Sequence, residues 1–168
     1  MERDWRPLLV YSILSLTCSV TLAQRLESFC ASSGPEDTVH DFVFQDLAGD
    51  DFSLRNLANG KALLVVNVAT FWGYTEQYPQ LNALKDFWND SGQLLEIMAV
   101  PCNQFGLQEP GKNEELLNGL RYVRPGNGYV PNFVLTAKTE VNGEGAHPMF
   151  NFLKVSNKTK YSLIVSCL

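Results

Sequence analysis

The stretch Leu63-Leu64-Val65-Val66-Asn67-Val68 decides the fold of this chain, because it is an apolar, β-branched run interrupted by a single amide. Such a run is typical of a strand that is covered on both faces, as in the middle of an α/β sheet. A second apolar run, residues 94–100, follows about one helix length later. Strand, helix and strand in this order predict a parallel pair joined by a crossover helix.

The segment between the two runs predicts that helix. Its apolar residues recur at helical spacing, and they are Tyr78, Leu81, Leu84 and Trp88. Thr75 is placed to cap the first turn, and Asp90-Ser91-Gly92 ends the helix.

Further elements are expected on either side of this unit. They are a hairpin of residues 39–44 and 52–57 around Gly49, a helix with Leu116, Leu117 and Leu120, a strand over 133–137, a turn at Asn142-Gly143, and a helix over 147–154 with Pro148 in its first turn. No internal repeat or second boundary interrupts the pattern, so residues 39–154 are interpreted as a single α/β domain.

Composition narrows the class of protein. The chain has 168 residues, of which 45% are hydrophobic and 18% charged, which is enough apolar material for one core. The net charge is -5, and lysine and arginine are scattered along the sequence. Nucleic-acid binding needs a cluster of basic side chains, which this sequence lacks, so this class of function is excluded.

The first 23 residues have the three parts of a secretory signal: Arg3 and Arg6 in front, an apolar run over 8–20, and small residues up to Ala23. The run is shorter than the roughly 20 residues that a membrane-spanning helix needs, so we expect a secreted protein without a membrane anchor. Residues 24–38 are expected to form a flexible leader. Two glycosylation sequons, Asn89-Asp90-Ser91 and Asn157-Lys158-Thr159, become usable in the secretory pathway.

The cysteines and histidines give no metal site. Cys18 leaves with the signal, and the three that remain, Cys30, Cys102 and Cys167, have neither disulfide-framework nor zinc-ligand spacing. Cys30 and Cys167 lie in predicted mobile ends and are interpreted as free or as pairing between chains. His147 precedes Pro148 at a predicted helix start, where a capping or surface role is expected.

Two loops are the expected seat of chemistry, because ligands gather at the carboxyl ends of parallel strands. Residues 67–75 lead from the first strand into the helix, and residues 101–106 leave the second strand. A thiolate or selenolate just before a helix N-terminus is kept nucleophilic by the helix dipole. Trp72 occupies that position, yet indole has no acid–base chemistry near neutral pH and cannot attack a peroxide.

At these loops the sequence resembles the glutathione peroxidases, in which a segment Asn-Val-Ala-(Ser/Thr)-x-U/C-Gly-x-Thr carries the peroxidatic selenocysteine or cysteine. The matching segments are Asn67-Val68-Ala69-Thr70-Phe71-Trp72-Gly73-Tyr74-Thr75, residues 77–84, Pro101-Cys102-Asn103-Gln104-Phe105-Gly106-Leu107-Gln108-Glu109, residues 122–126, and residues 141–143. The resemblance implies a thioredoxin-like sheet with flanking helices and a peroxidase reaction in which glutathione restores the enzyme. The signal peptide points to the secreted, plasma- or epididymis-type branch.

The resemblance also implies roles for single residues. Trp72 stands at the position of the family's selenocysteine or cysteine, and Gln104 matches the catalytic glutamine. Arg124 matches a residue associated with glutathione binding, although a solvated or interface arginine is an equal alternative. Residues 122–130 resemble the segment through which tetrameric members assemble.

The chain departs from the family at residue 72 and after Lys154. Selenocysteine is encoded by a stop codon one base away from the tryptophan codon, so Trp72 is interpreted as a misread selenocysteine. Residues 155–168 are unlike any family continuation, so the domain is expected to be C-terminally truncated, without two further members of the catalytic tetrad and with an exposed sheet edge.

Three functions remain open from the sequence. The first is a glutathione peroxidase that reduces hydrogen peroxide and organic hydroperoxides in defence against oxidative stress. The second is a catalytically inactive, secreted binding or interaction protein on the same scaffold, with Trp72 filling the pocket. The third uses Cys102 as a substitute nucleophile, although free cysteines are usually buried and inert.

Overall fold

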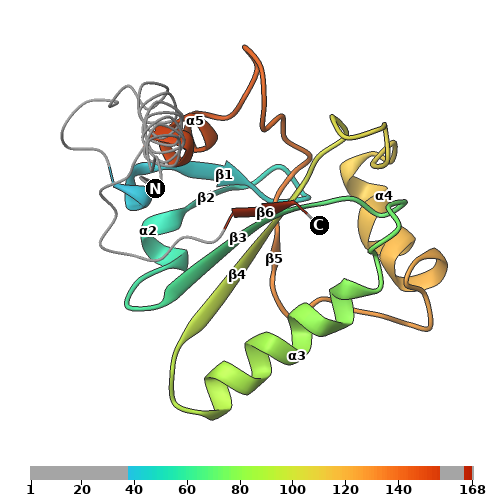
Figure 1. Ribbon diagram of the computed structural model, residues 1–168, viewed down its shortest axis with the longest axis horizontal. Helices are drawn as coiled ribbons and strands as arrows, with labels where there is room; N and C mark the ends of the chain where they lie inside the picture. Colours follow the sequence, from blue (N-terminus) through green and yellow to red (C-terminus); the bar gives the residue numbers. More distant parts are fainter. Residues whose placement is uncertain (1–37, 156–164, 168) are drawn as a thin grey trace, which may run out of the picture.

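The computed structural model describes residues 38–155 and 165–167, and it places a four-stranded sheet at the centre of the molecule (Figure 1). The strand order in this sheet is β5-β4-β3-β6, and a separate hairpin is formed by β1 and β2. The strands are β1 (Val43–Gln45), β2 (Asp51–Ser53), β3 (Ala62–Val68), β4 (Leu95–Pro101), β5 (Val134–Leu135) and β6 (Val165–Cys167). The helical elements are the 3-10 turn η1 (Val39–Asp41), α2 (Leu54–Leu57), α3 (Gln77–Asp90), α4 (Asn113–Asn118), the π-helical turn η2 (Gly119–Val123) and α5 (Pro148–Val155).

The expected parallel pair is confirmed. β3 and β4 are parallel and in register from Ala62 opposite Leu95 to Val68 opposite Pro101. Every residue of β4 is buried. The sheet is therefore covered on both faces, which explains why neither strand alternates between apolar and polar residues.

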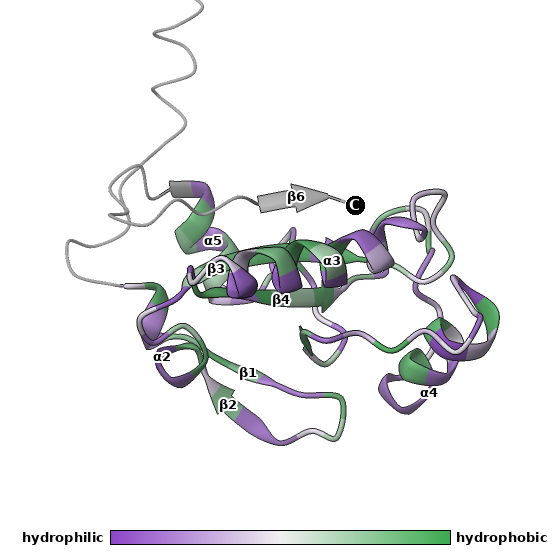
Figure 2. Cartoon of the chain, turned by 90° about the horizontal axis from the view of Figure 1, so that it is seen from below, coloured by the Kyte–Doolittle hydropathy of each residue, from purple (hydrophilic) through white to green (hydrophobic). Residues whose placement is uncertain are grey.

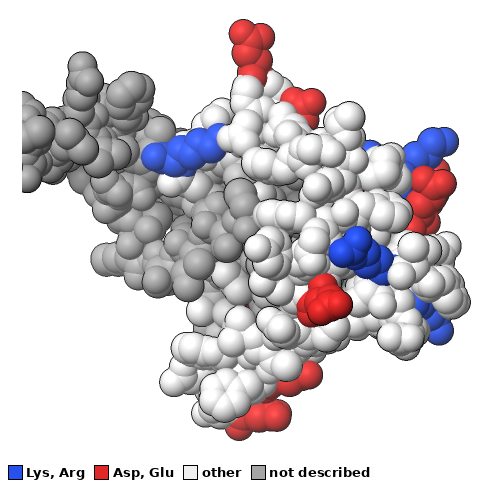
Figure 3. All heavy atoms as spheres, turned by 45° about the vertical axis from the view of Figure 1, so that its right-hand side comes forward, with Lys and Arg blue, Asp and Glu red and all other residues white. Residues whose placement is uncertain are grey.

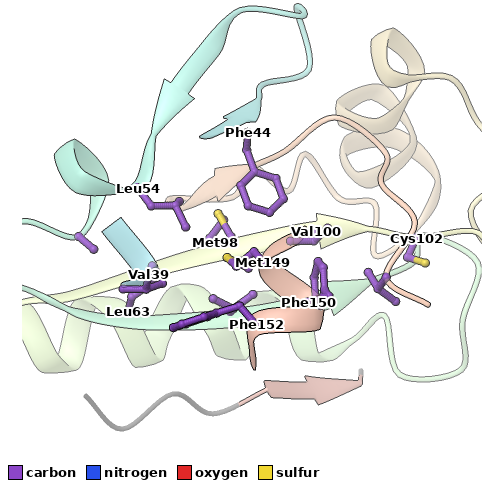
Figure 4. Close-up of a cluster of buried hydrophobic side chains, with 13 residues drawn as sticks. Val39, Phe44, Leu54, Leu63, Met98, Val100, Cys102, Met149, Phe150 and Phe152 are labelled. Carbon is purple, nitrogen blue, oxygen red and sulfur yellow. The ribbon is translucent and has the colours of Figure 1, made fainter. Parts of the chain in front are cut away.

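Two apolar cores lie on the two faces of the sheet, because successive side chains of a strand point to opposite sides. The hairpin-side core takes Leu63 and Val65 from β3 and Met98 and Val100 from β4 and packs them against the hairpin, α2 and α5. Figure 4 shows these side chains converging, with Cys102 at one end of the cluster. The α3-side core consists of Val66, Val68, Tyr78, Leu81, Leu95, Ile97, Ala99, Leu120, Phe133 and Leu135.

In the view of Figure 2, α3 crosses in front of β3 and β4, the β1–β2 hairpin and α4 lie below these strands, and α5 lies above them. The expected hairpin is confirmed, with Gly49 in its turn at a φ of 91° that favours glycine. Its strands are shorter than predicted because residues 39–41 and 54–57 are helical.

The predicted strand over 133–137 pairs with β4 at Val134 and Leu135, and the Thr136 N–H still donates to the Ala99 carbonyl at 3.0 Å. Thr136 then bridges to Asp46, and the Ala137 N–H donates to the Gln45 carbonyl at 2.7 Å. The chain thus leaves the sheet for the hairpin, which sequence periodicity does not reveal.

Helix α3 covers the predicted segment, but its apolar stripe is only half buried. Tyr78 and Leu81 lie in the α3-side core, whereas Leu84 and Trp88, in the second half of the helix, remain exposed. In the next helical segment Leu116 and Leu120 are buried and Leu117 is exposed. Helix α5 begins at Pro148, one residue after the predicted start, with this proline in its first turn as expected.

The sequence predicts an exposed sheet edge, and the structure covers one edge of β3 in part. β6 lies parallel to β3, with Val65 opposite Val165 and Asn67 opposite Cys167. Backbone pairing with residues 165–167 covers the β3 edge over these positions, so the segment that departs from the family supplies a strand.

The expected signal peptide, almost all of the expected leader, Cys18, Cys30 and the sequon at Asn157 lie outside the described residues. Within the described ranges, no helix is both long and apolar enough to cross a membrane.

His147 caps α5 in a defined tautomer. Its Nε2 lies 3.0 Å from the Val43 carbonyl oxygen and must donate, so Nδ1 is unprotonated and accepts from the Met149 N–H at 3.3 Å. The ring stacks on Phe44 with a centroid distance of 3.9 Å. Burial lowers the pKa of His147, and the bond to Val43 offsets this only in part.

We expect the free energy of unfolding to fall as the pH drops through 6.5, the ordinary pKa of histidine, towards the lower pKa that His147 has in the folded state. The unfolded chain binds the proton more readily, so the stability contributed by neutral His147 is fully present only above pH 6.5. Urea unfolding between pH 5 and pH 8 measures this (roughly the range in which histidine titrates). His147→Asn, which keeps a capping oxygen, should flatten the profile; a profile as steep as that of the parent chain would contradict the assignment.

Candidate active site

The two loops predicted to carry the chemistry do meet at the carboxyl ends of β3 and β4. The Cys102 N–H donates to the Val68 carbonyl at 3.0 Å, where the two strands end. Further along, the Phe71 N–H donates to the Gln108 carbonyl at 3.0 Å. These contacts join the loop of residue 72 to the loop of Gln104.

Residue 72 lies in a turn between β3 and α3, where the Trp72 side chain is half-buried. The expectation that Thr75 caps α3 is wrong: the helix begins at Gln77, and Glu76 occupies the cap position. The Thr75 hydroxyl oxygen instead lies 2.9 Å from the Thr70 carbonyl oxygen and 2.6 Å from that of Trp72, both of which are acceptors for its single O–H. Thr75 therefore closes the turn around residue 72 rather than starting the helix.

Gln104 is exposed on the second loop and is held by the turn at Asn142. Its Oε1 accepts from the N–H groups of Val141 and Asn142, both at 2.9 Å, and its Nε2 donates to the Asn142 carbonyl at 2.8 Å. A primary amide carries two N–H donors, and no described residue accepts from the second one. That N–H can serve a ligand beside the loop.

A buried carboxylate, which sequence analysis did not single out, fastens the first loop to the second. Glu109 is 1% exposed, and its Oε2 accepts from the Thr70 N–H at 2.7 Å and from Thr70 Oγ1 at 3.0 Å. Its own N–H donates to Asn103 Oδ1 at 2.9 Å. Thr70 and Glu109 are far apart in sequence, so no local pattern links them. The pair is identified by the burial of the glutamate, which only the structure shows.

The second oxygen of Glu109 is unusual. Oε1 is buried and has no hydrogen-bond partner among the described residues. Burial raises the pKa of Glu109, and the hydrogen bonds from Thr70 and the charge of Lys138 oppose this rise. Lys138 does not contact the carboxylate, since its Nζ donates to the carbonyls of Glu109 at 3.3 Å and Gly111 at 2.6 Å.

The other predicted residues take different places. Cys102 is 1% exposed and packs in the hairpin-side core, with Sγ 3.7 Å from Gln104 Oε1. A buried thiol is a poor nucleophile, which weighs against the Cys102 function. Arg124 is half-buried after the π-helical turn, where its N–H donates to the Gly119 carbonyl; its guanidinium forms no ion pair with a described residue.

Charged side chains of both signs are scattered on the face that Figure 3 shows, separated by uncharged surface. The described part of the chain contains no group of three or more histidine, cysteine, aspartate or glutamate side chains that could hold a metal ion.

We expect Glu109→Met to lower the free energy of unfolding by about 2–3 kcal/mol, because both donors of Thr70 lose their acceptor in a buried place. Glu109→Gln keeps an amide oxygen for these donors and should cost less than about 1 kcal/mol. Urea unfolding measures both, with the exposed Glu114→Met as the matched control. Equal losses for Glu109→Met and Glu114→Met would contradict the assignment.

The model of the glutathione peroxidase family matches residues 39–154 of this chain. Glutathione peroxidase 6 of Rattus norvegicus is 40% identical over 155 residues, which cover 92% of this chain and 69% of the relative. The glutathione peroxidase of Dirofilaria immitis is 45% identical over 151 residues, with 88% and 67% covered. The epididymal secretory glutathione peroxidase of Sus scrofa is 50% identical over 119 residues, with 71% and 53% covered.

Solved structures agree with the expected fold. The crystal structure of Trgpx in apo form has a TM-score of 0.53 at 26% identity, covering 76% of this chain and 70% of that one. The crystal structure of T. cruzi GPX1 has a TM-score of 0.50 at 26% identity, with 70% and 65% covered. The chain thus spans from about half to about two thirds of the length of its relatives. With its thioredoxin-like α/β fold and its match over residues 39–154, this chain belongs to the glutathione peroxidases, a family of oxidoreductases that act on peroxides.

Proposed function

We propose that this protein is a secreted glutathione peroxidase that reduces hydrogen peroxide and organic hydroperoxides, and that its residue 72 is selenocysteine in the natural product. The observation that supports this most is the junction at the carboxyl ends of β3 and β4. There the turn around residue 72 and the loop of Gln104 are joined by backbone and Glu109 hydrogen bonds. Secretion is supported by the relatives that are named epididymal secretory glutathione peroxidase.

In the proposed reaction one hydroperoxide is reduced to an alcohol and water, and two glutathione thiols are oxidised to one disulfide. Electrons and protons balance without a metal or an organic cofactor. The reactive atom must be a selenolate or thiolate at residue 72, because the indole of Trp72 offers only an N–H donor. The second N–H of Gln104 would stabilise charge on that atom, and Arg124 would bind a glutathione carboxylate.

We expect Trp72→Cys to gain glutathione-dependent peroxide reduction that the parent chain lacks. Its rate should exceed that of the matched control Trp72→Ser by about tenfold or more, because a cysteine thiolate attacks a peroxide and a serine hydroxyl without a base does not. Glutathione disulfide formed from hydrogen peroxide is measured with a coupled reductase assay. Sequencing the transcript through codon 72 shows separately whether the codon is the selenocysteine stop codon.

A folded Trp72→Cys variant with the rate of the serine control, together with a true tryptophan codon, would overturn the proposal. If codon 72 encodes selenocysteine and the cysteine variant is inactive, the same assay is repeated on the selenium-containing protein expressed from the full gene. Absence of turnover in that product would overturn it as well.

We expect Arg124→Ala, in the Trp72→Cys background, to raise the KM for glutathione about tenfold, because a charge-assisted carboxylate contact contributes roughly 1.5 kcal/mol or more. Arg124→Lys should give an intermediate KM, since an ammonium cannot bind a carboxylate in a bidentate way. Steady-state assays at varied glutathione concentration measure this, and Arg121→Ala is the control on the same segment. Unchanged KM values would assign Arg124 to the surface or to an interface.

The inactive binding protein is the second candidate, and one observation favours it. Phe71 and Tyr74 on either side of residue 72 are 47% and 60% exposed, and the Trp72 and Tyr74 rings form an edge-to-face pair at 5.6 Å. An exposed aromatic cluster of this kind suits a binding surface. A true tryptophan codon and a stable protein without peroxidase turnover would favour this candidate.

We further propose that residues 122–130 serve subunit contact in a homotetramer. Tyr122, Val123 and Val130 are exposed apolar residues on this segment. Tyr129 anchors the segment from within, because its hydroxyl oxygen lies 3.0 Å from the Tyr78 carbonyl oxygen and 2.9 Å from Asn82 Oδ1, both of which are acceptors for its single O–H. A rigid loop with outward apolar side chains suits assembly.

A further inference from the structure

The sequon Asn89-Asp90-Ser91 is not used by the candidate active site. It lies at the C-terminal end of α3, which ends at Asp90, and Asn89 is exposed there. Gly92 follows with a φ of 80°, and its N–H donates to the Asn89 carbonyl at 3.1 Å. Asn89, the residue that would accept the glycan, therefore lies in an exposed turn at the end of a helix.

The contacts of the Asn89 side chain leave the reactive atom available. Its Oδ1 accepts from the Leu95 N–H at 3.2 Å, and no described residue accepts from its Nδ2. N-glycosylation replaces one hydrogen on Nδ2 and keeps Oδ1 as an acceptor. The modification can thus be carried without breaking a hydrogen bond of the folded protein.

Exposed apolar residues lie close to this position in the sequence. Trp88, the preceding residue, is 37% exposed, and Leu94, next to the Leu95 N–H that bonds Asn89, is 55% exposed. Phe87 is exposed as well. A bulky, solvated glycan on Asn89 can cover exposed apolar residues of this kind.

The position also keeps a glycan away from the chemistry. The active-site loops lie at the carboxyl ends of β3 and β4, whereas α3 runs back along the sheet and ends where β4 begins (Figure 1). A helix of 14 residues spans about 20 Å. A glycan on Asn89 therefore starts at the opposite end of the sheet from residue 72.

We propose that Asn89 is an N-glycosylation site whose glycan covers the apolar surface at the end of α3 once the chain enters the secretory pathway. The donor is an oligosaccharide linked to a lipid diphosphate. A bond forms between Asn89 Nδ2 and the first sugar carbon, the bond from that carbon to the diphosphate oxygen breaks, Nδ2 loses a proton, and the lipid diphosphate leaves. The inference rests on the proposed secretion but not on peroxidase activity.

The test expresses the full chain in mammalian cells, once with its own first 23 residues and once with a heterologous signal peptide in front of Gln24. Asn157→Gln isolates the site at Asn89. Peptide-N-glycosidase converts a glycosylated asparagine into aspartate, which mass spectrometry detects at residue 89. We expect this conversion in the Asn157→Gln protein, its loss in Asn89→Gln and in Ser91→Ala, and its retention in Asp90→Asn.

The two signals separate the proposals. Glycosylation at Asn89 with the heterologous signal alone would support the site and overturn the proposed secretion. No glycan at Asn89 in a protein that the heterologous signal delivers to the medium would overturn the site. Removal of the glycan from the folded protein should increase the fluorescence of a bound apolar dye about twofold or more, as exposed aromatic surface becomes accessible; unchanged fluorescence would overturn the covering role.

Discussion

The parallel pairing of β3 with β4 is the constraint on which the rest of the structure depends. Seven consecutive pairs, from Ala62 with Leu95 to Val68 with Pro101, fix where both strands end. Because parallel strands end at the same edge, the turn around residue 72 and the loop of Gln104 are brought together by backbone geometry before any side chain acts. Burial of both faces then makes the register hard to shift, since a slip by one residue would exchange the side chains of the two cores.

Two buried glutamates show how the two ends of the sheet differ. Glu96 on β4 lies near the amino end, where the ammonium groups of Lys61 and Lys85 both contact its carboxylate. Glu109 at the carboxyl end receives two hydrogen bonds from Thr70, while its second oxygen has no partner among the described residues. The carboxylate of Glu96 is paired with two cations, whereas the Thr70 donors of Glu109 are neutral and burial raises the pKa of Glu109. The buried carboxylate that lacks a cationic partner thus lies on the loop that is joined to the turn around residue 72.

Sequence analysis succeeded where local pattern and burial coincide. The run at 63–68, the crossover helix and the turn at Gly49 follow from side-chain chemistry that acts over a few residues. It was wrong about Thr75, because a hydroxyl that could accept from a helix N–H donates instead to a carbonyl of the turn before it. It passed over Glu109, whose partner Thr70 is distant in sequence, and it did not foresee β6, because three residues with a serine between valine and cysteine carry too little periodicity.

The pairing of β6 with β3 has a consequence for the order in which the chain acquires its structure. Val65 meets Val165, so β3 is synthesised long before the segment that lies beside it. During translation β3 can pair with β4 early, while its other edge waits through the synthesis of all the intervening elements. A nascent chain with an apolar strand open at one edge is a natural substrate for chaperones, and the time until residues 165–167 emerge sets how long that protection is needed.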